Sequence, residues 1–182
     1  MVQLLGVGPI KQAFTGNDGG FEFKGLKTGE YLINVLDMAA MQRGKMNGKS
    51  RVVAIEGAET AAVEVAFGTG YKVRGIIRGL PPAPLRMVML RRPGGPGPEE
   101  VDPLDPKASI AAGKYQAGVG MVAPDGKYEI EDIEPGEYIL EVPRMPADPT
   151  DMQAYKTMNR KPHHRKEITV EKKDLEMDIE IK

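Results

Sequence analysis

The sequence predicts an all-β fold built from two related β-sandwich units in tandem. The main observation is a repeat: residues 18–36 and 125–143 follow one pattern, with matching residues 107 positions apart and no gap. The chain also holds 22 glycines and 15 prolines among its 182 residues, which suits short strands joined by tight turns. No region keeps a helical period of apolar residues beyond two turns.

Each copy of the repeat has a turn, an aromatic alternation, a second turn and a strand that opens with Gly-Glu-Tyr. The Asp-Gly pair predicts a tight turn, because glycine accepts a positive φ and aspartate caps its own turn. The corresponding residues of the two copies are Asp18 and Asp125, Gly19 and Gly126, Phe21 and Tyr128, Gly29 and Gly136, and Tyr31 and Tyr138.

The tyrosines that follow the second turn are interpreted as structural residues. Gly29 and Gly136 are expected to let the backbone bend sharply between sheets. Tyr31 and Tyr138 come just after this bend, as in a tyrosine corner, in which the ring packs inward and the hydroxyl bonds to upstream backbone.

Residues 70–182 contain the signals of a complete unit. In 71–78 the alternation through Val73, Gly75 and Ile77 predicts a first strand, and the prolines that follow end it because they cannot donate to a ladder. Later strands are expected at 85–91 and 114–123, followed by a hairpin turn at Asp125-Gly126.

The remaining strands of this unit are also read from alternation. Tyr128 and Ile130 form a short strand, and Tyr138, Leu140 and Val142 share one face of the next. Ile168 and Val170 begin another strand. In 175–181, apolar residues alternate with acidic ones, which predicts a half-buried strand.

Two long irregular loops are expected in this unit, at 92–107 and 143–162. The first is acidic and rich in proline, and is interpreted as a flexible spacer. The second, extended to residue 166, is hypothesised to be a partner surface because thioether and aromatic area lies beside positive charge. Its candidate residues are Met145, Met152, Tyr155, Met158, Arg160, His163, His164 and Arg165.

Residues 1–69 show the same pattern, but fewer residues precede its Asp-Gly turn. Val53 and Ile55 precede a turn, and Val63, Val65 and Phe67 predict a closing strand. Nothing before Asp18 corresponds to the strand at 71–78, and 2–7 match only the end of a second strand. We therefore expect the first unit to be truncated at its N-terminus, and the chain to be a fragment or to start at an internal Met.

The pattern Asp-Gly-x-aromatic-x-apolar, followed by Gly-x-Tyr, resembles the carboxypeptidase regulatory-like domain. The resemblance covers most of 71–182 and about two thirds of a domain in 1–69. It implies an immunoglobulin-like, prealbumin-like (transthyretin-like) Greek-key β-sandwich, related to adhesin B-type repeats and starch-binding-like folds. It also implies an extracellular, periplasmic or envelope location, although residues 1–20 show no signal peptide.

Composition excludes several classes of function. With a net charge of −1, nothing draws the chain to nucleic acid. There is no cysteine, hence no disulfide, thiolate metal site or thiol catalysis. No apolar run approaches about 18 residues, so membrane insertion is not expected.

No catalytic, metal or cofactor site is expected. His163 and His164 would face opposite sides of a strand and lie among cations, so they are interpreted as a solvated loop. Asp18 and Asp125 lack the spacing of a calcium loop. The two serines, Ser50 and Ser109, lie in no nucleophile motif.

The leading functional prediction is a non-catalytic accessory module of a larger secreted or envelope protein. It would act as a spacer or an interaction domain, with other domains of the same polypeptide, a protein or a polysaccharide as partners. The alternative is a carbohydrate-binding module, which predicts a row of exposed aromatic side chains; the chain has no Trp. An enzyme would need a catalytic constellation that the sequence lacks.

Overall fold

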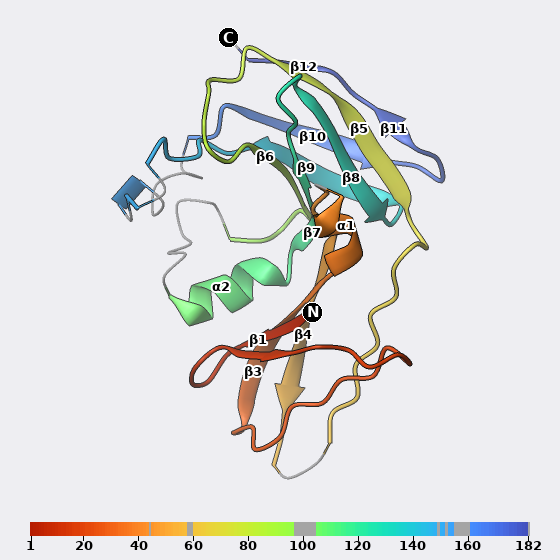
Figure 1. Ribbon diagram of the computed structural model, residues 1–182, viewed down its shortest axis with the longest axis vertical. Coiled ribbons are helices and arrows are strands. Elements are labelled where there is room, and N and C mark those ends of the chain that lie inside the picture. Colours follow the sequence, from red (N-terminus) through yellow and green to blue (C-terminus); the bar gives the residue numbers. More distant parts are fainter. Residues whose placement is uncertain are drawn as a thin grey trace.

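The computed structural model of the chain is predominantly β, as the sequence predicts. It describes residues 1–43, 45–57, 60–96, 105–148, 150–151, 153–154 and 161–181. Strands dominate this described part, and its helices, α1 and α2, are short. Buried hydrophobic residues gather in two clusters, one within residues 1–69, called the first unit, and one within residues 70–182, called the second unit. The two lie one above the other in Figure 1.

The first unit contains one antiparallel sheet with strand order β2-β1-β3-β4. Its strands are β1 (Val2–Leu5), β2 (Lys11–Ala13), β3 (Gly29–Leu36) and β4 (Gly48–Ile55). The short helix α1 (Met38–Gln42) connects β3 to β4, and the carboxylate of Asp37 caps it by accepting the N–H of Ala40. The buried core residues are Val2, Leu4, Tyr31, Ile33 and Val35.

The second unit contains two sheets that enclose a larger core. One has the order β10-β9-β6-β7 and consists of β6 (Met87–Arg91), β7 (Gln116–Met121), β9 (Gly136–Val142) and β10 (His164–Val170). The other is built around β5 (Tyr71–Arg78) with β8 (Lys127–Ile133), β11 (Leu175–Glu176) and β12 (Ile179–Glu180). Residues of both sheets meet in one cluster that includes Val73, Ile77, Leu90, Ile130 and Leu140.

Strand β5 is the centre of the second sheet. It pairs with β8 antiparallel, and with β11 and β12 parallel. Where the parallel ladder is interrupted, the carboxylate of Asp178 accepts the N–H of Ile76 at 3.0 Å. Gly75 is required here, since a Cβ would collide with the backbone of Met177. The predicted alternation over 175–181 is present, but as two short strands rather than one.

The sheet of the first unit repeats the order and register of a sheet of the second. Leu4 pairs with Ile33 as Leu90 pairs with Leu140, and Ile33 and Leu140 occupy the same repeat position. At the other edge of β1, Val2 pairs with Ala13, as Val88 of β6 pairs with Gly120. The order β2-β1-β3-β4 therefore corresponds to β7-β6-β9-β10.

The strand predicted at 63–67 is not formed, and the aromatic alternation at Phe21 and Phe23 does not form a strand either. Both stretches are extended along the same side of the first sheet, but neither pairs with another strand (Figure 1). Their counterparts in the second unit, β8, β11 and β12, all take β5 as ladder partner. Since the described part of residues 1–69 has no counterpart of β5, these stretches have no central strand with which to pair.

The Asp125-Gly126 turn connects two sheets, which corrects the prediction of a simple hairpin. Strand β7 belongs to one sheet and β8 to the other, and only the isolated bridge between Val122 and Tyr128 joins their ends. The turn itself forms as expected, with Gly126 at φ +85° and the Asp125 carboxylate accepting the N–H of Lys127.

Helix α2 (Pro106–Gly113) was not predicted, and it begins inside the expected loop 92–107. Asp105 caps it by accepting the N–H of Lys107 at 2.9 Å. The helix is only about two turns long, too short for its apolar residues to show a helical period. It packs against β3 and β4 of the first unit.

Candidate functional site: the joint between the two units

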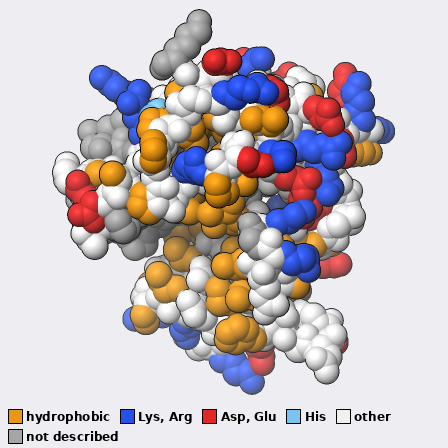
Figure 2. Space-filling view, turned by 45° about the horizontal axis from the view of Figure 1, so that its top comes forward, with side chains coloured by type: hydrophobic (Ala, Val, Ile, Leu, Met, Phe, Trp, Pro, Cys, Tyr) orange, Lys and Arg blue, Asp and Glu red, His pale blue; other side chains and the backbone are white. Residues whose placement is uncertain are grey.

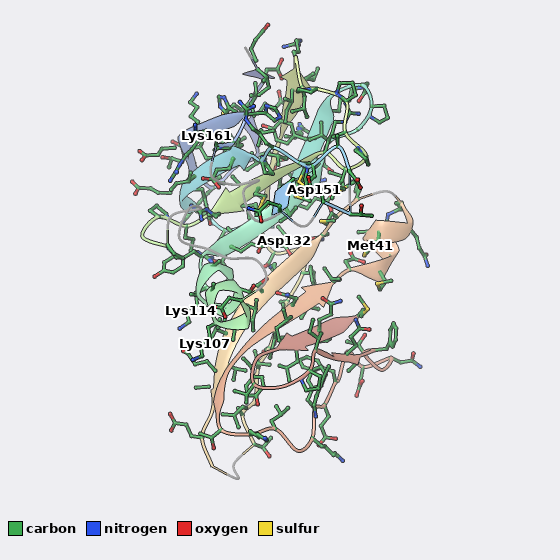
Figure 3. The ribbon with its side chains drawn as sticks, turned by 90° about the vertical axis from the view of Figure 1, so that its left-hand side faces the viewer. Met41, Lys107, Lys114, Asp132, Asp151 and Lys161 are labelled. Carbon is green, nitrogen blue, oxygen red and sulfur yellow. The ribbon has the colours of Figure 1, made fainter. Side chains whose placement is uncertain are left out.

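The two units meet at a buried carboxylate, that of Asp132 at the end of β8. Its side chain is 2% exposed and lies 2.9 Å from the ammonium of Lys49 in β4. It also accepts the backbone N–H groups of Gly68, Thr69 and Gly70, at 2.9, 2.9 and 2.8 Å. One carboxylate thus bonds to the first sheet, to the segment that connects the units and to Gly70 of the second unit. Figure 3 labels Asp132 where the second unit meets the first sheet.

Lys49 completes this arrangement from the side of the first unit. Its ammonium donates to the carbonyl of Ala66 at 2.6 Å and lies 5.7 Å from the centre of the Phe67 ring. Across from it, Gly70 approaches the backbone of Asp132 and Ile133 so closely that a Cβ would not fit. The connection between the units is therefore packed and hydrogen-bonded, unlike a flexible linker.

The environment of Asp132 keeps it ionised. Burial by itself would raise the pKa of this carboxyl, but the hydrogen bonds from Lys49, Gly68 and Gly70 outweigh burial, and the pKa lies below its ordinary value. A buried carboxylate with a cation and several N–H donors is fully satisfied, so its charge is retained in the interior.

Asp132 has a strained backbone, which the repeat explains. Its φ is +69°, the only positive φ of a non-glycine residue among those described. The corresponding residue of the first unit is Gly25, with φ +65°. The second unit thus places an aspartate where the repeat favours glycine, and the contacts of its carboxylate offset the strain. This substitution within the repeat was the sequence signal that could have revealed Asp132.

A second set of ion pairs lies at the edge of the joint. Lys45, from the first unit, is 2.6 Å from Glu129 and 2.9 Å from Glu131 of β8, and Lys72 is 3.1 Å from Glu131. The hydrogen bond from Lys45 is the main cause that lowers the pKa of Glu131 to about 2, and Lys72 acts in the same direction against partial burial. The same contacts raise the pKa of Lys45 and of Lys72.

Helix α2 fastens the opposite side of the joint. It lies over the outer face of β3 and β4, where Gly113 packs so tightly on Leu32 that a Cβ would collide with that side chain. Leu32 and Ile110 are buried, and Lys114 lies 2.8 Å from Glu30 of β3. Figure 3 shows Lys107 and Lys114 on this helix beside the first sheet.

The joint leaves little room for a ligand. A cavity of about 10 Å³ lies between β4 and β7, enough for about one water molecule. Its lining residues are Lys49, Ser50, Arg51, Arg92, Gln116, Ala117, Asp132, Glu134 and Tyr138. Charges of both signs line it and pair with one another, as Lys49 does with Asp132 and Arg92 with Glu134.

A broader groove of about 630 Å³ crosses the outer face of β5 and β8. Its basic residues have acidic partners: Lys45 pairs with Glu129, and Arg74 lies 2.7 Å from Glu176. Figure 2 shows basic and acidic side chains interspersed over the second unit. Such mutual pairing leaves no concentrated charge of one sign for a charged ligand.

The predicted structural motif residues form matching corners in the two units. The hydroxyl of Tyr31 donates to the carbonyl of Lys27 at 2.9 Å, and that of Tyr138 to the carbonyl of Glu134 at 2.7 Å. Both rings are buried. The glycines before them differ, because Gly29 has φ +152° whereas Gly136 has no positive φ and its Cβ would make only ordinary contacts.

The other motif residues also differ between the copies. The Asp18 carboxylate accepts the N–H of Gly20, and Gly19 has φ +79°, so the first Asp-Gly turn forms like the second. Tyr128 is buried and donates to the carbonyl of Met177 at 2.8 Å, whereas Phe21, its counterpart, is only half-buried and has no hydroxyl.

The hypothesised partner surface is only partly described. Met152, Tyr155, Met158 and Arg160 lie outside the described residues. Met145, His163 and His164 are half-buried and Arg165 is exposed. His164 and Arg165 belong to β10 and pair with Val142 and Glu141, so the interpretation of His163 and His164 as a solvated loop is wrong for His164. The alternation of strand β10 was missed at its start because basic residues occupy it.

A buried charge cluster lies behind this strand. Glu141 is 5% exposed and lies 3.3 Å from both Arg91 and Arg165. His164 pairs with Val142, the residue after Glu141, and burial, together with Lys166, lowers the pKa of this imidazole. No group of three or more potential metal ligands occurs among the described residues. Nor does any helix in the described ranges have the length and apolarity needed to cross a membrane.

Comparison with known proteins identifies no relative. No family model matches the chain, and no curated protein or solved structure shows significant similarity to it.

Proposed function

We propose that the chain is a tandem of two non-catalytic β-sandwich units that acts as a rigid spacer. Each unit would have the prealbumin-like fold of the carboxypeptidase regulatory-like domain, and the first would lack the central strand of its second sheet. The shared strand order and register of β2-β1-β3-β4 and β7-β6-β9-β10 support this reading.

The observation that carries the spacer function is the joint at Asp132. A flexible tether between modules would be exposed and poor in contacts. Here a buried ion pair, three backbone hydrogen bonds and helix α2 fix one unit to the other. We infer that the chain holds neighbouring domains of a larger secreted or envelope protein at a set distance and orientation.

The interaction role is proposed for the same module, with a protein or polysaccharide as the partner. The carbohydrate-binding alternative gains no support from the described aromatic residues. Phe14 is exposed, whereas the other described aromatic side chains are buried or half-buried and form no exposed row.

Rigidity can be measured directly, because the chain has no cysteine and accepts spin labels at chosen positions. Glu56→Cys at the end of β4 and Lys173→Cys in the second unit are both exposed and lie in different units. Pulsed electron paramagnetic resonance should give one narrow distance distribution between the labels. A broad distribution in the otherwise unaltered chain would overturn the proposed spacer function.

The role of the joint is tested in the same doubly labelled chain. Replacing Lys49→Met together with Asp132→Asn removes both charges of the buried pair and should broaden the distribution. Asp125→Asn with Lys127→Met removes an exposed ion pair of 2.8 Å in the second unit and serves as the matched control. Equal broadening in both variants would show that the joint does not set the orientation.

A further inference from the structure

The first unit leaves one side of its core incompletely covered. Its sheet buries Val2, Leu4 and Ile33, but the stretches opposite contribute only partly buried residues. These are Phe21, Phe23, Leu26, Val63, Val65 and Phe67. In the second unit, β5 lies on the corresponding side and its Val73 and Ile77 are buried. Orange side chains are visible over the lower, first unit in Figure 2.

The backbone of the two stretches is also unpaired. Among described residues, 21–26 and 61–67 take part in no backbone–backbone hydrogen bond. Two of their carbonyls are instead approached by lysine side chains: Lys24 accepts from Lys11 at 3.0 Å, and Ala66 from Lys49. Extended backbone with free N–H and C=O groups is a template for an added strand.

The second unit shows what occupies this position. There β5 runs between β8 and the β11–β12 segment and supplies the ladder partner of all three strands. Val73 pairs with Ile130 and Gly75 with Tyr128. The repeat places Phe23 at the position of Ile130 and Phe21 at that of Tyr128.

We propose that the first unit binds an extended peptide strand between residues 20–26 and 61–67. The strand runs antiparallel to 20–26 and carries apolar residues at alternate positions, one of them opposite Phe23. This inference rests on the proposed correspondence of the two units. Main-chain hydrogen bonds supply the affinity and the alternate apolar side chains supply the selectivity.

Strand β5, which occupies this position in the second unit, also predicts a small residue in the bound strand. Gly75 faces Tyr128, and the backbone of Met177 leaves no space for a Cβ at that position. The stretch 61–67 would approach the bound strand as Met177 approaches β5. A glycine opposite Phe21, two residues from the apolar residue opposite Phe23, is therefore part of the recognised pattern.

The first test uses a synthetic peptide of residues 71–80 as the probe and the full chain as the receptor. Hydrogen–deuterium exchange read by mass spectrometry should slow by about ten-fold or more in 20–26 and 61–67 at saturating peptide. Peptides with Val73→Asp and Ile77→Asp, or with Gly75→Val, should leave the exchange unchanged.

Three results would overturn the proposal. One is equal protection by the aspartate peptide, which would indicate non-specific association. Another is protection confined to 127–133, which would mean that the peptide exchanges with β5 in the second unit. The third is protection of 20–26 without peptide, in a chain that sediments as a dimer, which would assign the position to a second copy instead.

A second test supplies the strand covalently. Because Val2 and Val88 hold the same register position, Met1 corresponds to Met87, and a copy of residues 71–86 fused before Met1 reproduces the connection from β5 to β6. We expect the fused chain to show the same local protection and to lose its response to the peptide. Unchanged exchange in 20–26 would count against the proposal. The label distances across the joint are independent of this result, so a failure here leaves the spacer function standing.

Discussion

The two units carry the same aromatic alternation, but only in the second unit do these residues form a strand that pairs in a sheet. Tyr128 and Ile130 lie in β8, whereas Phe21 and Phe23, at the same repeat positions, lie in extended backbone without a ladder. The sheet β2-β1-β3-β4 of the first unit matches the sheet β7-β6-β9-β10 of the second in strand order and register. The difference therefore arises at β5, which is the partner of every other strand in the second sheet. Alternation selects the face that a residue presents, but a strand forms only where a partner satisfies its backbone.

The same comparison explains the joint. At one repeat position the first unit has Gly25 and the second has Asp132, both with positive φ. In the first unit the residue only turns the chain, and a Cβ on Gly25 would meet nothing within 4 Å. In the second unit the side chain binds the other unit. The two residues at this repeat position thus share a backbone conformation, but only Asp132 makes a contact between the units.

The largest effect is expected when the units are separated. Residues 70–182 should unfold in a cooperative transition, because both sheets and the core between them are present. Residues 1–69 should show no cooperative transition, because one side of their core is open and α2 is lost. Thermal unfolding followed by circular dichroism compares the two fragments. A sharp transition of 1–69 alone would contradict this account of the first unit.

The next largest effect should follow removal of the buried carboxylate. Asp132→Ala should lower the free energy of unfolding of the full chain by about 3–5 kcal/mol, since it leaves Lys49 and three N–H groups without their partner. Gly25→Ala, at the same repeat position, should cost only about 1–2 kcal/mol through its positive φ. Denaturant unfolding measures both changes.

A matched variant of Asp132 separates the effect of backbone strain from the effect of losing the contacts of its carboxylate. Asp132→Gly removes the carboxylate without imposing a side chain on a positive φ, so it should remain strongly destabilising. If it proved as mild as Gly25→Ala, the contacts of the carboxylate would not be what holds the units together.

A smaller effect is expected at the tyrosine corners. Tyr138→Phe should destabilise the chain by roughly 1–2 kcal/mol, because the carbonyl of Glu134 loses its hydroxyl partner. Tyr31→Phe removes the equivalent bond to Lys27 and should act in the same direction. Denaturant midpoints provide the measurement. Unchanged stability with weakened binding of a partner would instead place Tyr138 in a binding site.

The smallest effect concerns pH and the edge of the joint. The pKa of Glu131 is lowered from 4.5 to about 2 in the folded chain, so its ion pairs stabilise the fold above about pH 4.5. This contribution should be lost as the pH falls from about 4.5 to about 2, where the carboxylate becomes protonated. Melting temperatures over this range should fall less steeply in Lys45→Met than in the unaltered chain. Parallel curves would show that Lys45 does not stabilise this carboxylate.

Much of the second unit was predictable from sequence because its signals are local. The range 71–78 matched β5 in full, and the buried faces of 138–142 and 175–181 followed their alternation. Other boundaries depended on contacts that are not local. Strand β10 starts at His164 because it pairs with β9, although its first residues are histidine, arginine and lysine.

The sequence by itself determined which residues form turns, which faces are apolar, and that one pattern occurs twice. These properties follow from φ preferences and side-chain period, which act over a few neighbouring residues. Only the tertiary structure showed that Asp132 meets Lys49, that α2 covers Leu32, and that Lys45 reaches Glu129, 84 positions away. The stabilisation from such pairs depends on burial and on the way the units dock, and no local pattern encodes either.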